Sequence, residues 1–219
     1  MDSSLSECGP IQGIIDAALM EDLASGDVTG RVTVPAQTRW RARLVVKTRL
    51  VQAGIAVARQ VFHTVDRELR CEVHLRDGEV AAPGTVLMDL EGNARALLAG
   101  ERTALNLLQR MCGVATLTRA YVDAAAGRCR ICDTRMTMPG LRALDRYAVR
   151  CGGGHNHRND LGAGVLIKEN HIRAAGGVAE AVLRARVHAP HTLRIECEVT
   201  DHNELQLSLI HISEPTRPY

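Results

Sequence analysis

The second half of the chain alternates between apolar, strand-like segments and amphipathic helices, and this alternation restricts the fold more than any other feature. After Gly113 the predicted elements are a helix over 115–126, a strand over 129–133, a helix over 140–151, a strand over 165–168, a helix over 176–188 and a strand over 193–199. Strands that are separated by helices pair in parallel within one sheet. We therefore expect an α/β barrel or a doubly wound sheet in this part of the chain.

The first 112 residues follow a different pattern, in which helices interrupt short β-rich segments. The predicted elements are helices over 10–24 and 54–64 and strands over 40–46, 71–75 and 86–90, which indicate an α+β segment. The clearest helix covers 94–112, and its apolar arc has Glu101 near the middle and Arg102 at the edge. Because burial of an unpaired charge costs several kcal/mol, Arg102 either forms an internal ion pair or points into a site that holds an anion.

The composition argues against several classes of protein. A net charge of +2 over 219 residues creates no field that would attract nucleic acid or a membrane surface, and 2% aromatic residues are too few for a base-stacking platform. No run of about 18 apolar residues is present, and residues 1–10 lack the pattern of a signal peptide. Seven scattered cysteines fit reduced thiols. We expect a cytoplasmic protein with no nucleic-acid or membrane partner.

Charged residues gather where the predicted parallel strands end. The first strand leads into Arg135, the second ends in Lys168, and the third carries Glu196 and Glu198. These two glutamates are two residues apart, so both side chains point to one side of the strand. In a parallel barrel the carboxyl ends of the strands lie on the face that binds substrates. We therefore expect these side chains to lie close together.

A glycine-rich loop, 152–154, follows the predicted helix 140–151 and leads into His157 and Arg158. Consecutive glycines allow a backbone to approach a ligand closely. The cationic residues of the whole group are Arg102, Arg135, His157, Arg158 and Lys168. Arginine binds carboxylates and phosphates through two parallel hydrogen bonds, so this group fits a small substrate with several negative charges. The alternative is a solvated rim of the sheet, but charges at three adjacent strand ends favour a site.

Other patterns give weaker signals. Cys129 and Cys132 have zinc or redox spacing, but residues three apart on a strand face opposite sides, so we interpret both as core residues. His155, His157 and His171 lack a carboxylate–histidine motif at helical spacing, which favours contact with an anion over metal binding. The glycine loop is not followed by the Lys-Ser/Thr pair of a nucleotide-binding P-loop.

Several sequence words between about residue 10 and residue 206 resemble the quinolinate phosphoribosyltransferase family. The matching words are EDL at 21–23, GDVT at 26–29, GERTALN at 100–106, DTR at 133–135, PGLR at 139–142, CGGGHNHR at 151–158 and LIKENHI at 166–172. The resemblance implies an α/β protein with an N-terminal α+β sandwich domain over 1–112. The front part of an α/β barrel of phosphoribosyltransferase type II would follow over 113–206. It also implies a homodimer.

The resemblance further implies an activity and a role for each site residue. The enzyme would transfer phosphoribosyl from phosphoribosyl pyrophosphate to quinolinate, with Mg²⁺ as cofactor, and would release nicotinate mononucleotide, pyrophosphate and CO₂ for NAD biosynthesis. The quinolinate carboxylates would be held by Arg102 of the neighbouring subunit, Arg135, His157 and Arg158. Lys168 would contact the phosphoribosyl donor. Glu198, rather than Glu196, would bind ribose hydroxyls or Mg²⁺.

Two features depart from the family pattern. Met136 stands where the family has lysine after the Thr-Arg pair, which leaves open a molybdenum-operon paralogue with the same fold and a different substrate. The span 113–206 is also short for a barrel, which normally needs roughly 200 residues, so the later phosphate-binding loops would be missing. We therefore predict a truncated chain that shows no turnover. The segment 207–219 (LSLIHISEPTRPY) does not fit what precedes it, and we exclude it as a non-native tail.

Overall fold

The computed structural model of the chain describes residues 11–212, and the side chains of residues 11–209. The chain divides into two compact units, of which the first ends at His157 and the second begins at Arg158. The predicted domain boundary at residue 112 falls inside a long helix of the first unit. No helix within residues 11–212 is long and apolar enough to cross a membrane.

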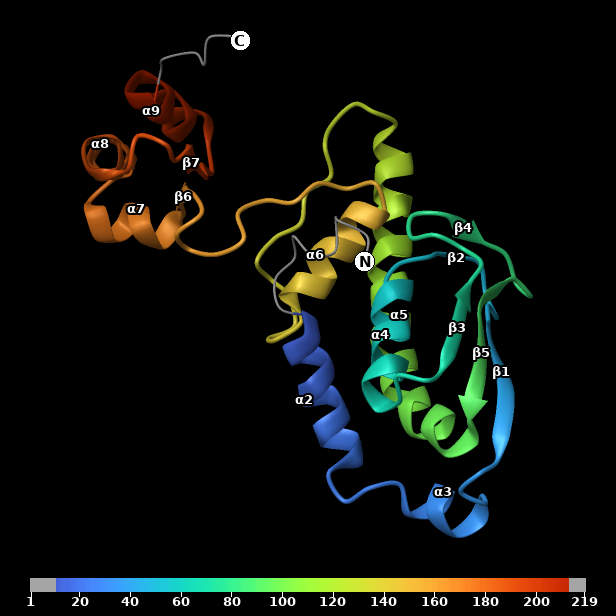
Figure 1. Ribbon diagram of the computed structural model, residues 1–219. Helices are drawn as coiled ribbons and strands as arrows, with labels where there is room; N and C mark the ends of the chain where they lie inside the picture. The colour runs from blue at the N-terminus through green and yellow to red at the C-terminus, as the bar shows by residue number, and fades with distance from the viewer. Residues whose placement is uncertain (1–10, 213–219) are drawn as a thin grey trace. The chain divides into compact units, whose positions relative to one another are not determined.

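The first unit is an antiparallel sheet packed against helices (Figure 1). Its elements are α2 (Ile11–Leu23), α3 (Val28–Thr33), β1 (Arg39–Val45), β2 (Leu50–Val51), α4 (Ile55–Val65), β3 (Arg70–Val73), β4 (Val80–Ala81), β5 (Val86–Asn93), α5 (Ala94–Ala125) and α6 (Arg142–Cys151). The main sheet has the strand order β1-β5-β3, and β2 and β4 form a separate antiparallel pair. This arrangement confirms the N-terminal α+β sandwich that the sequence predicts. The short elements α3, β2 and β4 were not predicted.

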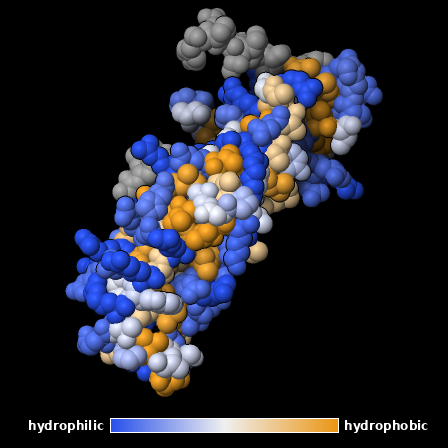
Figure 2. Space-filling view, turned by 90° about the vertical axis from the view of Figure 1, so that its right-hand side faces the viewer, coloured by the Kyte–Doolittle hydropathy of each residue, from blue (hydrophilic) through white to orange (hydrophobic). Residues whose placement is uncertain are grey.

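One side of the main sheet forms the core of this unit. Met88 and Leu90 of β5 face α4 and α5 and are buried together with Phe62 and Met111. The intervening residues, Asp89 and Glu91 among them, point to the other side, because successive side chains of a strand alternate between faces. Apolar side chains also reach the surface, as Figure 2 shows on one face of the molecule. Scattered exposure of this kind is ordinary for globular proteins.

Helix α5 runs without interruption through Gly113, whereas the sequence analysis predicted two helices with a break at this glycine. That prediction was wrong, because the apolar stripes on either side of Gly113 are in phase. Ala104 and Met111 before it and Ala115 after it are all buried. One glycine inside a helix costs only about 1 kcal/mol, which burial of a continuous stripe offsets. Gly113 itself lies on the exposed side of the helix.

The placement of Glu101 within the apolar arc of this helix was also wrong. Leu97, Ala104 and Leu107 define the buried stripe, whereas both Glu101 and Arg102 are exposed. The predicted apolar arc included Leu105, which is only partly buried. The buried stripe of the helix is therefore rotated from its predicted position. Neither charged residue needs an internal partner.

The second unit contains a short parallel pair of strands covered by helices. Its elements are β6 (Val165–Ile167), α7 (Glu169–Ala175), α8 (Val178–His188), β7 (Ile195–Cys197) and α9 (His202–Ile212). β6 and β7 pair in parallel, with Val165 opposite Ile195, as their alternation with helices predicts. The buried apolar side chains of this unit are few: Ile167, Val178, Ala181 and Val182. Helix α7 was not predicted.

Two further expectations about the second half differ from the structure. The predicted strand 129–133 is reduced to one parallel bridge between Cys132 and His155. Among residues 11–212 the parallel pairing consists of this bridge and β6–β7, and no closed barrel forms. The excluded segment 207–219 begins inside α9, which continues through Ile212, and residues 213–219 lie outside the described part of the chain.

Candidate functional site

The segment before Arg135 and the segment around His155 lie side by side in the first unit. The backbone N–H of His155 donates to the carbonyl oxygen of Ile131 (2.8 Å), and the N–H of Asp133 donates to the carbonyl oxygen of His155 (2.9 Å). Both segments run in the same direction. Arg135 and His157 therefore follow the same end of this short parallel pairing.

The carboxylate of Asp133 connects the two segments. Its side chain is only 5% exposed and lies 3.3 Å from the Arg146 guanidinium. It accepts hydrogen bonds from the backbone N–H of His157 (2.6 Å) and from Nδ2 of Asn156 (2.6 Å). A buried carboxylate is tolerated when it is paired and hydrogen-bonded in this way. In the sequence, Asp133 stands out only as part of a motif, and no local pattern predicts a function for Arg146 or Asn156.

The loop after Arg135 is held by α6. Arg142, the first residue of α6, donates from Nε to Oγ1 of Thr137 (3.1 Å) and from Nη2 to the carbonyl oxygen of Arg135 (3.4 Å). The Arg135 side chain is partly buried, whereas Met136 is 90% exposed. Met136 therefore occupies a position from which a longer cationic side chain would extend freely into solvent.

The glycine run 152–154 has a packing role that the sequence analysis did not anticipate. A Cβ on Gly152 would lie 2.5 Å from the carbonyl oxygen of Ala115 and 2.6 Å from Cβ of Thr118. A Cβ on Gly154 would lie 2.9 Å from Cγ2 of Thr118. Glycine is required at these positions because the loop packs directly on α5. The sequence pattern had suggested a different reason for the glycines, namely close approach of the backbone to a ligand.

In the second unit, Lys168 and Glu198 form an ion pair at the carboxyl ends of β6 and β7. The Lys168 Nζ lies 2.6 Å from Oε1 of Glu198, and about half of each side chain is exposed. The parallel register places the two residues next to each other, because Lys168 follows β6 and Glu198 follows β7. Glu196 lies within β7 and is partly buried. Arg158 donates from Nη1 to the carbonyl oxygen of Gly164 (2.9 Å).

The predicted site residues therefore fall into two groups, one in each unit. Arg135 and His157 follow one parallel pairing in the first unit, and Lys168 and Glu198 follow the other in the second. Arg102 is exposed on α5 in the first unit. The convergence of all these residues on one substrate remains a prediction from the sequence.

The structure also bears on the cysteines and on metal binding. Cys129 and Cys132 were predicted to be core residues, but both are exposed, because the strand that would have buried one of them does not form. Within residues 11–212 no group of three or more His, Cys, Asp or Glu side chains is arranged to hold a metal ion.

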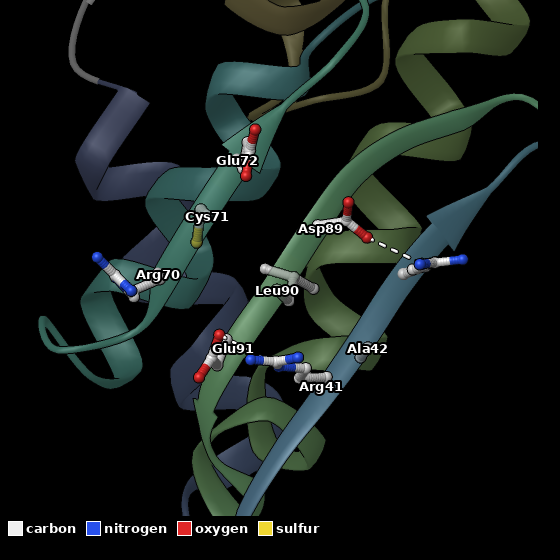
Figure 3. Close-up of a pocket in the computed structure, with 9 residues that line it drawn as sticks. Arg41, Ala42, Arg70, Cys71, Glu72, Asp89, Leu90 and Glu91 are labelled. Carbon is white, nitrogen blue, oxygen red and sulfur yellow. Dashed lines mark hydrogen bonds and ion pairs between the residues drawn. The ribbon is translucent and has the colours of Figure 1, made fainter.

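A hollow in the first unit lies elsewhere, on the outer face of the main sheet (Figure 3). Acidic residues of the central strand β5 face arginines of the neighbouring strand β1: Arg41 lies 3.3 Å from Glu91, and Arg43 lies 3.1 Å from Asp89. His74 also contacts Asp89, at 2.7 Å, and this hydrogen bond is the main reason that the pKa of Asp89 lies below its usual value. Because Asp89 and Glu91 at this hollow are already paired with protein cations, we do not assign a site to this face.

Comparison with known proteins adds an independent observation. Residues 27–112 match the sequence model of the N-terminal domain of quinolinate phosphoribosyl transferase, and residues 114–211 match that of its C-terminal domain. The chain belongs to the quinolinate phosphoribosyltransferase family. Its two-domain organisation, with an N-terminal sheet domain and a C-terminal α/β region, is that of the family.

Individual relatives resemble the chain along most of its length. It is 40% identical to the "Probable nicotinate-nucleotide pyrophosphorylase [carboxylating]" of Bacillus subtilis over 90% of this chain and 68% of that protein. A Synechocystis protein with the same name is 41% identical over 86% of this chain and 64% of its own length. The crystal structure of NadC from Streptococcus pyogenes superposes with a TM-score of 0.88 at 36% identity, over 92% of this chain and 72% of that one. The chain thus spans about two thirds of the length of these family members.

Proposed function

We propose that this chain carries the quinolinate-binding part of a quinolinate phosphoribosyltransferase. The reaction would transfer phosphoribosyl from phosphoribosyl pyrophosphate to quinolinate and release nicotinate mononucleotide, pyrophosphate and CO₂ for NAD biosynthesis. One observation carries the proposal: the segments that lead into Arg135 and His157 pair side by side, and Asp133 holds them together. The chain in which this pairing occurs matches the quinolinate phosphoribosyltransferase family. The names of the relatives support the same reaction.

The residue types suit a pyridine ring with two adjacent carboxylates. In this proposal, Arg135, His157 and Arg158 bind the carboxylates, since guanidinium groups bind carboxylates through two parallel hydrogen bonds. Arg102 of a neighbouring subunit completes the set, which requires a homodimer. Holding both carboxylates fixes the ring and therefore the direction of its nitrogen, and such orientation lowers a reaction barrier by several kcal/mol in favourable cases.

The chemistry takes place at the anomeric carbon of the donor. The pyridine nitrogen of quinolinate forms the new bond, pyrophosphate leaves, and the sugar carbon passes through a cation-like state. We assign Lys168 to the departing phosphates, whose charge it would stabilise, and Glu198 to the ribose hydroxyls. CO₂ is then lost from the carbon next to the ring nitrogen, the positive charge of the pyridinium stabilises the electron pair that remains on this carbon, and a proton from water takes up that pair to give nicotinate mononucleotide.

The described residues fit Mg²⁺ only as a partner of the donor phosphates. Mg²⁺ is usually held by one or two carboxylates together with substrate phosphates. Glu198 is half exposed and offers one carboxylate, with Glu196 two residues before it. When bound, Mg²⁺ would neutralise charge on the leaving pyrophosphate.

Binding of quinolinate to the 219-residue chain tests the proposal. We expect isothermal titration calorimetry to detect binding, and Arg135→Ala to weaken it by about tenfold or more, since a charge-assisted hydrogen bond to a carboxylate is lost. Arg128→Ala serves as a control, because Arg128 is exposed and donates only to backbone carbonyl groups of its own segment. An absence of quinolinate binding, or equal losses in the two variants, would contradict the proposal.

Turnover is a separate measurement. Incubation of the chain with quinolinate, phosphoribosyl pyrophosphate and Mg²⁺, followed by assay for nicotinate mononucleotide, tests the prediction that this chain shows no turnover.

The cytoplasmic location inferred from the cysteine content also remains a prediction.

Met136 favours one second candidate, a paralogue of the same fold with a different substrate. Its side chain is 90% exposed next to Arg135, and methionine cannot pair with an anion. If the substrate is quinolinate, Met136→Lys should tighten quinolinate binding, because it adds a cation at the family's lysine position. Unchanged or poorer binding in Met136→Lys, with weak binding by the native chain, would favour the paralogue.

A further inference from the structure

The peptide groups on both sides of His157 are held by the same pair of side chains. Asp133 accepts a hydrogen bond from the N–H of His157 at 2.6 Å, and Nη1 of Arg146 donates to the carbonyl oxygen of His157 at 2.9 Å. Fixing the N–H fixes the peptide plane before the Cα of His157, and fixing the carbonyl oxygen fixes the plane after it. The two backbone dihedrals between these planes are then set, and with them the direction in which the His157 side chain leaves the backbone.

The carboxylate of Asp133 is fully used by protein groups. Oδ1 accepts from His157, Oδ2 accepts from Nδ2 of Asn156, and the Arg146 guanidinium lies beside both oxygens. Asn156 uses the same Nδ2 to donate to the carbonyl oxygen of Arg146 (2.9 Å), which ties the loop back to α6. A carboxylate that is 5% exposed and accepts this many hydrogen bonds is not available to a substrate.

We propose that Asp133, with Arg146 and Asn156, is a positioning group that sets the direction of His157 toward the pyridine dicarboxylate. This inference rests on the proposed function, because it concerns how the same site is built. Asp133 acts through the backbone and does not touch the substrate. A side chain binds a substrate fully only when it is held within about half an ångström of its productive position. Loss of the hydrogen bonds to the peptide groups of His157 should therefore weaken substrate binding even when the protein stays folded.

A matched control comes from a second buried carboxylate, Asp145 of α6. Asp145 is 8% exposed and forms two hydrogen bonds with Arg110 of α5, at 2.8 and 2.7 Å. It therefore resembles Asp133 in burial and in its arginine partner, but it contacts neither peptide group of His157. Asp133→Asn and Asp145→Asn both remove one negative charge from a buried pair without a change of side-chain size.

The experiment measures two quantities in the native chain and both variants. The first is the hydrogen-exchange rate of the His157 amide, followed by NMR, and the second is the dissociation constant for quinolinate, measured by calorimetry. In Asp133→Asn we expect His157 exchange to accelerate and the dissociation constant to rise by on the order of tenfold. In Asp145→Asn we expect both quantities to stay within about twofold of the native values. The same result in Arg146→Lys, which keeps the charge but not the fork geometry, would support the proposal if Asp133→Asn does not fold.

The outcomes separate this inference from the proposed function. Native exchange and affinity in Asp133→Asn would overturn the positioning role, and so would equal changes in Asp133→Asn and Asp145→Asn. If the native chain does not bind quinolinate, the proposed function fails. In that case, faster exchange of the His157 amide in Asp133→Asn alone would still establish that Asp133 holds the loop in place. Unchanged exchange would overturn this role of Asp133.

Discussion

The surroundings of Gly152 and Gly154 leave no space for a side chain. Both pack against Thr118 of α5, and Gly152 also faces the carbonyl oxygen of Ala115. A main-chain oxygen cannot move aside as the end of a flexible side chain can. The loop that leads to His157 therefore tolerates no side chain at these positions.

We predict opposite effects of alanine at two glycines near α5. Gly152→Ala should lower the free energy of unfolding by about 1–3 kcal/mol, because it overpacks a close backbone contact. Gly113→Ala should raise it by up to about 1 kcal/mol, because Gly113 is helical, exposed and has open space around an added Cβ. Urea unfolding followed by circular dichroism measures both. A neutral Gly152→Ala would contradict the packing explanation.

The cysteines differ in environment, and we predict that they differ in reactivity. Burial raises the pKa of Cys112 to about 11 and that of Cys151 to about 12, whereas Cys129 and Cys132 are exposed. Because the thiolate is the reacting form, iodoacetamide at pH 8 should modify Cys129 and Cys132 before Cys112 and Cys151. Mass spectrometry of peptides after short exposure measures the order. Early modification of Cys112 would contradict the predicted burial.

The same raised thiol pKa values predict a loss of stability in alkali. In the unfolded chain these thiols ionise near their ordinary pKa of 9.0, whereas in the folded protein they stay protonated up to about 11 or 12. The folded state therefore binds more protons between these values, and its stability falls as pH rises through this window. We expect the urea midpoint to fall between pH 9 and pH 11, and Cys112→Ala to reduce the slope. A midpoint that is constant across this range would contradict the assignment.

The sequence could nominate candidate site residues by type and position, but it could not predict their contacts. Arg135, His157, Lys168 and Glu198 could be selected because each comes at or near the end of a predicted strand or in a glycine-rich loop. The role of Asp133 depends on a backbone N–H 24 residues away, and no local pattern reports such a contact. The exposure of Cys129 and Cys132 likewise depended on whether a strand formed.

Helix α6 buries Leu144 and Ala148 in the core of the first unit, and polar contacts add to this attachment. Arg110 of α5 pairs with Asp145, and the hydroxyl of Tyr147 donates to Oδ2 of Asp77 at 2.8 Å. Asp77 also accepts from the backbone N–H of Ile55 at the start of α4. These contacts explain why α6 belongs to the first compact unit although it follows the predicted boundary at residue 112.

We predict that Tyr147→Phe loosens this attachment. The hydroxyl is lost from a buried hydrogen bond to a carboxylate, which should lower the free energy of unfolding by about 1.5–3 kcal/mol. Tyr121→Phe is the matched control, since Tyr121 is 59% exposed on α5, and a surface change of this kind stays within about 0.5 kcal/mol. Equal stability of the two variants would mean that Asp77 does not hold α6.

The elements themselves were predictable where hydrophobic spacing was strong. Helices α2, α4, α6 and α8 and strands β1, β3, β5, β6 and β7 match predicted elements to within a few residues. Several short elements, β2, β4, α3 and α7, were missed because so few residues carry no clear period. The break predicted at Gly113 failed because tertiary packing outweighs the low helix propensity of one glycine.

At the scale of the whole molecule, the two units differ greatly in the size of their cores. The first has a continuous buried cluster that extends from Ile15 to Ala148. The second buries four apolar side chains in its own cluster: Ile167, Val178, Ala181 and Val182. A small segment with so little buried apolar surface gains little free energy to oppose the entropy of folding.

We therefore predict different behaviour of the two units in isolation. A fragment of residues 1–157 should unfold cooperatively in urea, whereas a fragment of residues 158–219 should lack a cooperative transition. Circular dichroism of the separate fragments measures both. A cooperative transition in the shorter fragment would show that its small core suffices for folding.

The uninterrupted course of α5 has a consequence for how its sequence can change. Arg102 lies near its beginning and Thr118, which contacts the glycine loop, lies near its end. Each residue of an α-helix adds about 100° of rotation, so one inserted or deleted residue between them would turn the two ends relative to each other. The rotation would carry Arg102 or Thr118 off its face of the helix. Natural variation in this stretch should therefore consist of substitutions, with length held constant.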